Sequence, residues 1–158
     1  MELDTTDGPL RTSLHPDEQG TQILPLKDRL PASVLIVGGG SHESYPRLHR
    51  GEISLDIAVH ARPDVYGTIT GAPFRDKTFA RIIFQWLPTA LWRTSSVLQE
   101  ARRILRKGGE LRIETSANAV PWDLVDLLEE CGFSEVRVVS LGRSDLPHGV
   151  AVIALRAK

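Results

Sequence analysis

Two features of the sequence could hold a small ligand: the glycine run Gly38-Gly39-Gly40 and the acid Asp56. Consecutive residues without a Cβ let the backbone approach a ligand closely and adopt positive φ at no steric cost. A carboxylate can accept both hydroxyl protons of a ribose in two charge-assisted hydrogen bonds. Together the two features favour an adenosine-type ligand. The alternatives are a glycine turn that is only flexible and an acid that is only solvated.

Both features stand at the ends of apolar runs that predict strands. The run over 33–37 is continuously apolar, which is typical of a strand covered on both faces, and the run over 53–57 contains Asp56 near its end. In an open α/β sheet the ligand lies beyond the carboxyl ends of the strands, and the glycine-rich turn after the first strand commonly holds a nucleotide. We therefore expect the glycines and Asp56 to share one edge of a sheet.

The rest of the chain predicts an α/β fold, a Rossmann-like, mostly parallel sheet that ends in an antiparallel hairpin. The third strand should be rudimentary, because the connection from Ile57 to Asp64 is too short for a helical crossover. Gly108-Gly109 is expected to close the first long helix. The expected elements are strands over 64–70, 80–86 and 111–115, helices over 90–107 and 121–131, and a terminal strand pair over 135–141 and 149–155.

The length of 158 residues predicts about one domain. Residues 1–31 are rich in Thr, Asp, Gly, Pro and Gln, which predicts an N-terminal arm that lies on the domain or stays mobile. The domain itself is expected over 32–158. Nineteen basic and twenty acidic side chains give a net charge of −1, which argues against nucleic acid as a partner.

Cys131 is the only cysteine, which excludes an internal disulfide and a cysteine-based zinc cage. No run is long and apolar enough for a membrane span, and the first residues lack the pattern of a secretory signal. The chain is expected to be cytoplasmic, with no membrane association and no bound metal.

An ordered series of segments supports a more specific interpretation. The segments VLIVGGG, ISLDI, GAPFRDKTF and ARRILRKGGELRI follow one another along the chain. In this series the sequence resembles the class I S-adenosylmethionine-dependent methyltransferases, in particular short members with a reduced helix after the first strand. The resemblance covers about residues 33–156 and implies a minimal methyltransferase-type fold with S-adenosylmethionine as cofactor.

The resemblance also implies which residues bind the cofactor. Gly38, Gly39 and Gly40 would form the turn against its methionyl part, Asp56 would hold the ribose diol, and Ile57 would lie against the adenine.

Residues at two later strand ends complete the implied site. Thr68 and Ile69 would border the adenine edge, and Gln85 and Trp86 would face the departing methyl group. Methyl transfer depends mainly on positioning two reactants, so no unique catalytic residue is demanded. If a base is needed, His42 and His60 are candidates, because histidine titrates in the right range.

Four positions depart from the family's pattern. Ile36, Thr68 and Ala80 stand where the family often has acids, and His42 stands where it has a third glycine. These departures keep open a second hypothesis, a binding or scaffolding protein that has lost catalysis. A third hypothesis is a nicotinamide-dinucleotide domain, although Glu43 would repel a pyrophosphate at the third fingerprint position.

The leading hypothesis is methyl transfer to a small molecule, or to an acceptor presented by a partner protein. The chain has little material for a substrate lid, so a homodimer or a partner protein is expected to complete the acceptor site.

Overall fold

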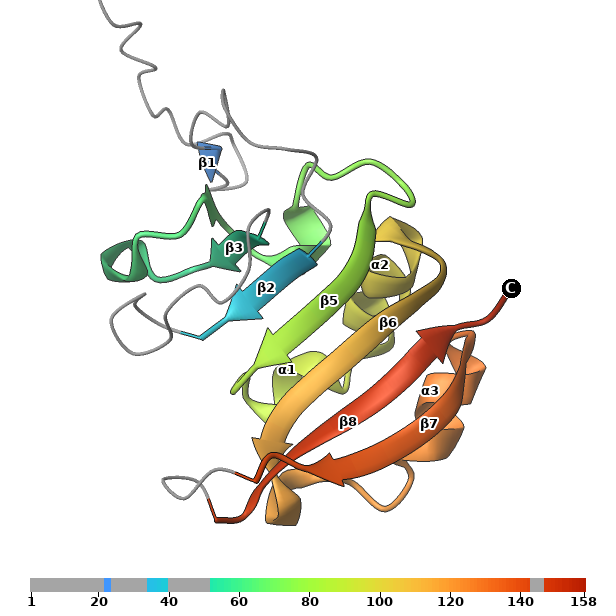
Figure 1. Ribbon diagram of the computed structural model, residues 1–158. Coiled ribbons are helices and arrows are strands. Elements are labelled where there is room, and N and C mark those ends of the chain that lie inside the picture. The colour runs from blue at the N-terminus through green and yellow to red at the C-terminus, as the bar shows by residue number, and fades with distance from the viewer. Residues whose placement is uncertain (1–21, 24–33, 40–51, 143–146) are drawn as a thin grey trace, which may run out of the picture.

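The computed structural model describes residues 22–23, 34–39, 52–142 and 147–158 (Figure 1). These residues form one eight-stranded sheet with the strand order β1-β4-β3-β2-β5-β6-β8-β7. The strands are β1 Gln22–Ile23, β2 Val34–Gly38, β3 Glu52–Asp56, β4 Val65–Tyr66, β5 Phe79–Gln85, β6 Leu105–Ser116, β7 Phe133–Ser140 and β8 Gly149–Arg156.

The directions of the strands confirm the predicted fold class. Strands β4, β3, β2, β5 and β6 are parallel, whereas β8 pairs antiparallel with both β6 and β7. The short connection from β7 to β8 therefore makes the predicted antiparallel hairpin, and β8 is inserted beside β6. At the other end, β1 pairs antiparallel with β4, so two residues of the expected N-terminal arm extend the sheet.

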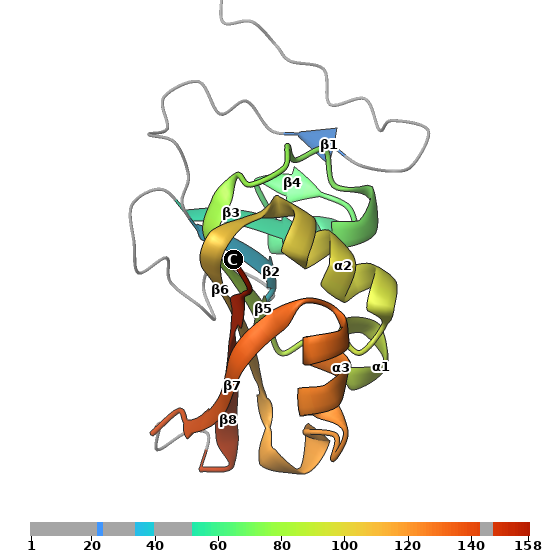
Figure 2. The ribbon, with the colours of Figure 1, turned by 90° about the vertical axis from the view of Figure 1, so that its right-hand side faces the viewer.

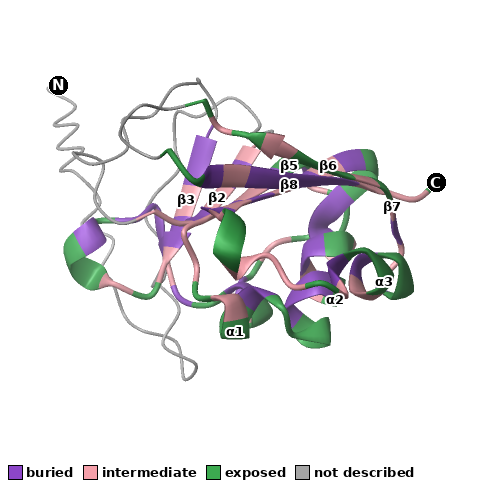
Figure 3. Cartoon of the chain, turned by 90° about the horizontal axis from the view of Figure 1, so that it is seen from below, coloured by how far each residue is buried: buried purple, intermediate pink, exposed green. Residues whose placement is uncertain are grey.

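All three α-helices of the described chain lie on one side of the sheet (Figure 2). Four apolar residues of α2 at helical spacing are buried against the sheet, whereas polar residues such as Gln99 and Arg102 are exposed; Figure 3 shows buried and exposed parts of the helices by colour. No helix in these ranges is long and apolar enough to cross a membrane. The α-helices are α1 Thr89–Trp92, α2 Ser95–Ile104 and α3 Leu124–Glu130, and the short 3-10 turns are η1 Val59–Ala61, η2 Ile69–Gly71 and η3 Ala117–Ala119.

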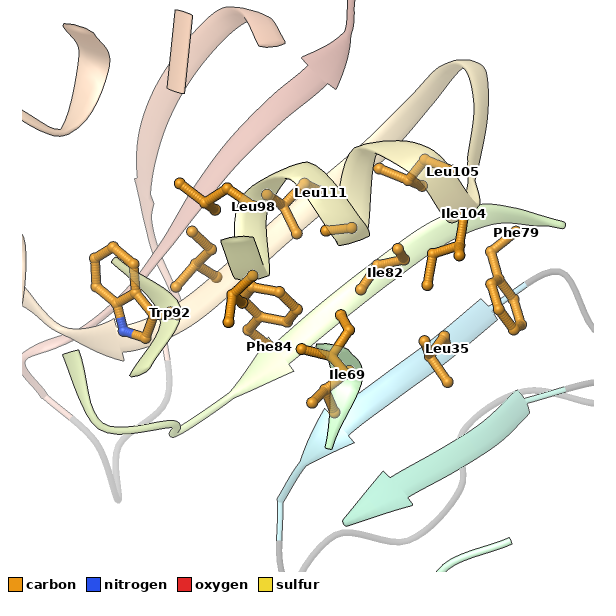
Figure 4. Close-up of a cluster of buried hydrophobic side chains, with 14 of the residues drawn as sticks. Leu35, Ile69, Phe79, Ile82, Phe84, Trp92, Leu98, Ile104, Leu105 and Leu111 are labelled. Atoms are coloured by element: carbon orange, nitrogen blue, oxygen red, sulfur yellow. The ribbon is translucent and has the colours of Figure 1, made fainter. Parts of the chain in front are cut away.

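The core lies between the sheet and these helices (Figure 4). Phe79, Ile82 and Phe84 of β5 project into it and are each 0% exposed. The ring of Phe79 meets that of Phe74 edge to face, with centroids 5.0 Å apart. From Ile82 of β5 and Gly109 of β6 onward, alternate residues are buried against the helices, and the intervening residues point to the opposite face of the sheet.

The prediction of one helix over 90–107 is wrong in its continuity and at its carboxyl end. The helical segment is interrupted at Arg93 and Thr94, and α2 ends at Ile104, where the chain turns directly into β6. The N–H of Lys77 and the guanidinium of Arg156 donate to the carbonyl of Arg103, so the end of the helix needs no glycine cap.

Gly108 and Gly109 lie within β6 and do not cap the helix. The pairing of β5 with β6 jumps from Phe79–Leu105 to Arg81–Glu110, so a bulge separates the two regular stretches. Gly108 has φ of +70°, and a Cβ on Gly109 would meet the carbonyl oxygen of Arg106 at 2.8 Å. The glycines are therefore needed by the bulge.

Two other boundaries are also corrected. The third strand is rudimentary, as predicted, but β4 contains only Val65–Tyr66, and the expected strand over 64–70 continues as η2. The second helix begins at Leu124, later than the predicted residue 121. It ends as predicted, because Gly132 follows it with φ of +84°.

Candidate functional site

The pairing register places the predicted ligand residues in one row. Gly38 of β2 lies opposite Gln85 of β5, and Gln85 lies opposite Glu114 of β6. Asp56 of β3 follows Leu55, which pairs with Val37, so Asp56 stands beside Gly38. The row crosses four parallel strands at their carboxyl ends, on the sheet face away from α1, α2 and α3. This is the edge where parallel sheets bind ligands.

The glycine turn is shaped by the chain's own packing. Gly38 and Gly39 have φ of +80° and +90°, which disfavours any residue with a Cβ. A Cβ on Gly38 would lie 2.5 Å from Cδ2 of Leu87 and 2.9 Å from the carbonyl oxygen of Gln85. A Cβ on Gly39 would lie 2.2 Å from Oε1 of Gln85. The fold itself therefore requires glycine at both positions, independently of any ligand.

Asp56 is fixed at the end of β3 and half-buried. Its Oδ1 accepts a hydrogen bond from the backbone N–H of Ala58 at 2.8 Å, and its carbonyl oxygen accepts one from Gly67 N–H at 2.9 Å. Within the described ranges, no hydrogen bond is formed by its Oδ2. One carboxylate oxygen therefore orients the side chain and the other remains available to a hydroxyl donor.

Asp64 anchors the connection that follows Asp56. Its Oδ2 accepts hydrogen bonds from the N–H of Ser54 at 2.9 Å and from the hydroxyl of Ser54 at 3.1 Å, and its own N–H donates to that hydroxyl at 3.0 Å. Asp64 is 5% exposed. Since Ser54 lies in β3, this clamp holds the β3–β4 connection and with it the backbone around Asp56.

The residues predicted near the adenine divide into two kinds. Ile57 is 62% exposed, although it is apolar, and it follows Asp56 directly. Thr68 is exposed and its hydroxyl lies 3.2 Å from that of Thr70. Ile69, in contrast, is 3% exposed and packs in the core near Leu35 (Figure 4). Ile57 and Thr68 can meet a ligand at the surface, whereas the side chain of Ile69 belongs to the core.

Gln85 and Trp86 lie where the sequence predicts them, at the end of β5. Gln85 Nε2 donates to Glu114 Oε2 at 3.3 Å. Trp86 has φ of +54° and its backbone N–H donates to the Glu114 carbonyl oxygen at 3.0 Å. A left-handed conformation disfavours a residue with a Cβ by about 1–2 kcal/mol. Such strain held at the ligand edge of a sheet is typical of functional sites.

Of the candidate bases and the third glycine of the turn, the structure describes only His60. His60 is exposed on η1, on the side of β3 that faces away from β5. Gly40, His42 and Glu43 lie outside the described residues. Among the residues that the structure does describe, no His, Cys, Asp and Glu side chains gather into a group that could hold a metal ion.

Sequence reasoning missed Glu114 and Arg112. Arg112 Nε donates to Glu114 Oε1 at 2.8 Å, so the carboxylate joins Arg112 to Gln85. The alternation of polar and apolar residues over 110–115 was the available signal, because it puts Arg112 and Glu114 on the same face of a strand. Arg103, in contrast, lies in α2 and pairs with Glu100 and Asp76. These carboxylates raise the pKa of the Arg103 guanidinium.

A hollow of about 440 Å³ lies elsewhere, between the ends of α2 and α3. It is lined by Gln99, Arg102, Glu130, Cys131 and Gly132. Burial raises the pKa of the Cys131 thiol, which keeps it protonated and unreactive. This hollow lies near the start of β7, away from the row of Asp56, Gly38 and Gln85, and we do not place the functional site there.

Comparison with known proteins supports the fold. No family model and no curated protein matches the sequence. A solved S-adenosylmethionine-dependent methyltransferase of Thermotoga maritima, described as a possible histamine N-methyltransferase, has a TM-score of 0.62 at 19% identity. The match covers 78% of this chain and 81% of that one.

Two other solved structures show the same similarity. Phosphoethanolamine N-methyltransferase 2 of Haemonchus contortus, in complex with S-adenosylmethionine, has a TM-score of 0.59 at 10% identity, covering 83% of this chain and 50% of that one. The complex of the Haloferax volcanii Trm112 methyltransferase activator with a proposed methyltransferase has a TM-score of 0.60 at 14% identity. This match covers 84% of this chain and 85% of that one. At these identities the similarity establishes the fold, which is that of the class I methyltransferases.

Proposed function

We propose that this chain, which has the class I methyltransferase fold, binds S-adenosylmethionine and transfers its methyl group to a small molecule or to an acceptor that a partner presents. The observation that carries the proposal is the row of Asp56, Gly38 and Gln85 at the carboxyl ends of three adjacent parallel strands. The row stands at the ligand edge of a fold shared with proteins of this activity.

The residues of the row fit the chemistry of this cofactor. Asp56 has an oxygen available to the ribose hydroxyls, and the exposed Ile57 beside it offers an apolar surface to the adenine. Thr68 can accept a hydrogen bond at the adenine edge in place of an acid. Gln85 and Trp86 stand at the other end of the row, where the methionyl part and the acceptor would meet.

When bound, the cofactor supplies an electrophilic methyl group. The work left to the protein is to hold the acceptor in line with that group and to exclude water, and such positioning can supply about 7–11 kcal/mol of a barrier. Trp86, held by its N–H bond to the carbonyl of Glu114, is the side chain we assign to the acceptor side. His60 lies on η1, on the side of β3 away from Gln85 and Trp86, so we assign it no role as a base.

Titration calorimetry with S-adenosylmethionine and S-adenosylhomocysteine tests this proposal. We expect both to bind the parent chain, and Asp56→Asn to weaken binding of both. The asparagine keeps the Oδ1 acceptor for the Ala58 N–H but loses the charge. Folded protein that gives no heat with either compound would contradict the proposal. Greater thermal stabilisation by NAD than by S-adenosylhomocysteine would favour the dinucleotide alternative.

A second candidate function is a binding protein of the same fold without catalysis. Two observations favour it: Ile36 and Ala80 replace acids of the resembled family, and Leu87 and Gln85 pack closely against the glycine turn. Loss of a charged acceptor weakens binding by about 1–3 kcal/mol per site. Binding of neither nucleoside by a folded chain would favour this candidate.

The acceptor side is expected to be completed by a second chain. We propose a homodimer or a partner protein for this role, in line with the activator complex seen for one protein of this fold. Light scattering that shows a monomer at every concentration, together with full activity of the isolated chain, would remove this expectation.

A further inference from the structure

A series of three polar side chains, Arg112, Glu114 and Gln85, leads from the middle of the sheet to the glycine turn. Arg112 Nε donates to Glu114 Oε1 at 2.8 Å, and Gln85 Nε2 donates to Glu114 Oε2 at 3.3 Å. Gln85 Oε1 in turn lies so close to Gly39 that a Cβ there would stand 2.2 Å from it. Strands β6 and β5 and the glycine turn after β2 are thus connected by one continuous set of contacts.

The contact with Glu114 fixes the orientation of the Gln85 amide. Glu114 as a carboxylate only accepts hydrogen bonds, so the Gln85 atom that it contacts must be the NH₂ group. The carbonyl oxygen of the amide is then turned toward Gly39. Arg112 holds the Glu114 carboxylate in place through this contact, and the pair is half-buried, with side-chain exposures of 27% for Arg112 and 15% for Glu114.

We infer that Glu114 is a positioning residue that, through Gln85, presents a hydrogen-bond acceptor at the glycine turn and thereby selects ligands with a cationic ammonium group there. The inference rests on the proposed function, in which the amino-acid part of S-adenosylmethionine lies against this turn. An ammonium group has three donors and no acceptor, so a carbonyl oxygen suits it and an NH₂ group would repel it. Within the described chain, Gln85 Oε1 makes no hydrogen bond that would compete.

Two ligands separate this role from that of the adenosine-binding residues. S-adenosylhomocysteine carries the amino-acid group, whereas 5′-methylthioadenosine has the same adenosine and thioether without it. Calorimetry would measure both ligands on the full-length parent, Gln85→Met, Glu114→Gln and the double variant. Glu110→Gln is the matched control, since Glu110 lies on the same strand face, pairs with Arg81 at 3.0 Å and is similarly buried.

We expect Gln85→Met and Glu114→Gln each to weaken S-adenosylhomocysteine about tenfold, because a hydrogen bond to a charged group is lost. Affinity for 5′-methylthioadenosine should change less than about twofold, and the double variant should lose no more than Gln85→Met alone, because the two residues act as one unit. Glu110→Gln should behave as the parent.

The possible outcomes distinguish this inference from the proposed function. Equal loss of both ligands in Glu114→Gln would show a merely structural role and overturn the inference. So would unchanged affinity for S-adenosylhomocysteine, or additive losses in the double variant. In each of these cases the parent still binds adenosine compounds and the proposed function stands. A folded parent that binds neither compound overturns the proposed function and this inference together.

Discussion

The two halves of the sheet are built differently. Strands β5, β6, β7 and β8 have 7, 12, 8 and 8 residues, and all three α-helices follow strands of this half. Strands β2, β3 and β4 have 5, 5 and 2 residues, and the connection between β3 and β4 is a 3-10 turn. The long half buries most of the large side chains, whereas the short half carries Gly38 and Asp56.

This difference indicates a division of labour. A half with long strands and packed helices supplies most of the burial that stabilises the fold. A half with short strands and exposed residues such as Ile57 leaves its polar groups available to a ligand. Gln85 and Glu114 stand at the border, where the stable half can hold a side chain rigidly against the glycine turn of the other half.

The largest expected effect is in the long half. Leu111 is 0% exposed in β6, so Leu111→Ala removes buried methyl groups and leaves a cavity. We expect the free energy of unfolding to fall by about 2–5 kcal/mol, measured by urea denaturation. Val138→Ala is the control in the same half, because Val138 is 53% exposed, and should change stability by less than about 0.5 kcal/mol. Equal effects of the two variants would break the comparison.

A glycine pair sharpens the comparison. Gly38→Ala places a Cβ at positive φ and in collision with Leu87 and the Gln85 carbonyl. We expect a loss of about 1–2 kcal/mol from the conformation and about 1–3 kcal/mol more from overpacking. Gly108 also has positive φ but no atom within 4 Å of its Cβ position, so Gly108→Ala should show the first contribution alone. If the two variants melt alike, the packing against the glycine turn is looser than described.

A smaller effect is expected on binding, with none on stability. Asp56→Asn should weaken S-adenosylhomocysteine by about 1.5–3 kcal/mol, because hydrogen bonds to a charged acceptor are lost. The free energy of unfolding should stay within about 0.5 kcal/mol of the parent value, since the asparagine Oδ1 still accepts the hydrogen bond from the Ala58 N–H. Glu129→Gln, on the exposed side of α3, controls for the loss of one negative charge. A destabilised Asp56→Asn would assign Asp56 to the fold and not to a ligand.

The smallest expected effect is on stability at alkaline pH and arises from Cys131, which lies in the long half. Burial raises the pKa of the Cys131 thiol in the folded chain. The unfolded chain therefore loses this proton first as the pH rises above about 8.5. This contribution to stability is present below that pH and is lost as the pH rises through the folded pKa. Urea denaturation across this range should show a shallower decline for Cys131→Ala than for the parent, and parallel declines would contradict the assignment.

The sequence predicted the fold better than the boundaries of its elements. The apolar run over 33–37 and the paired terminal runs are strong signals, because their burial and short connection allow few other arrangements. The end of α2 was misplaced because Gly108-Gly109 looks like a helix cap, whereas a bulge against β5 requires it. That pairing involves residues distant in sequence, which local patterns do not contain.

The candidate site was predicted only in part, for a related reason. Asp56 and Gln85 could be found because each ends an apolar run, and strand ends meet at one edge of a parallel sheet. Glu114 was missed because its importance comes from the register that brings it opposite Gln85. The burial of Ile69 was missed because η2 turns the chain inward after a strand that is only two residues long.

The measurement that tests the central claim most directly is a crystal structure of the chain grown with S-adenosylhomocysteine. We predict both ribose hydroxyls within about 3.2 Å of the Asp56 carboxylate and the amino-acid group against Gly39 and Gln85. A nucleoside bound elsewhere, with Asp56 turned to solvent and Gln85 still closing the glycine turn, would contradict the account.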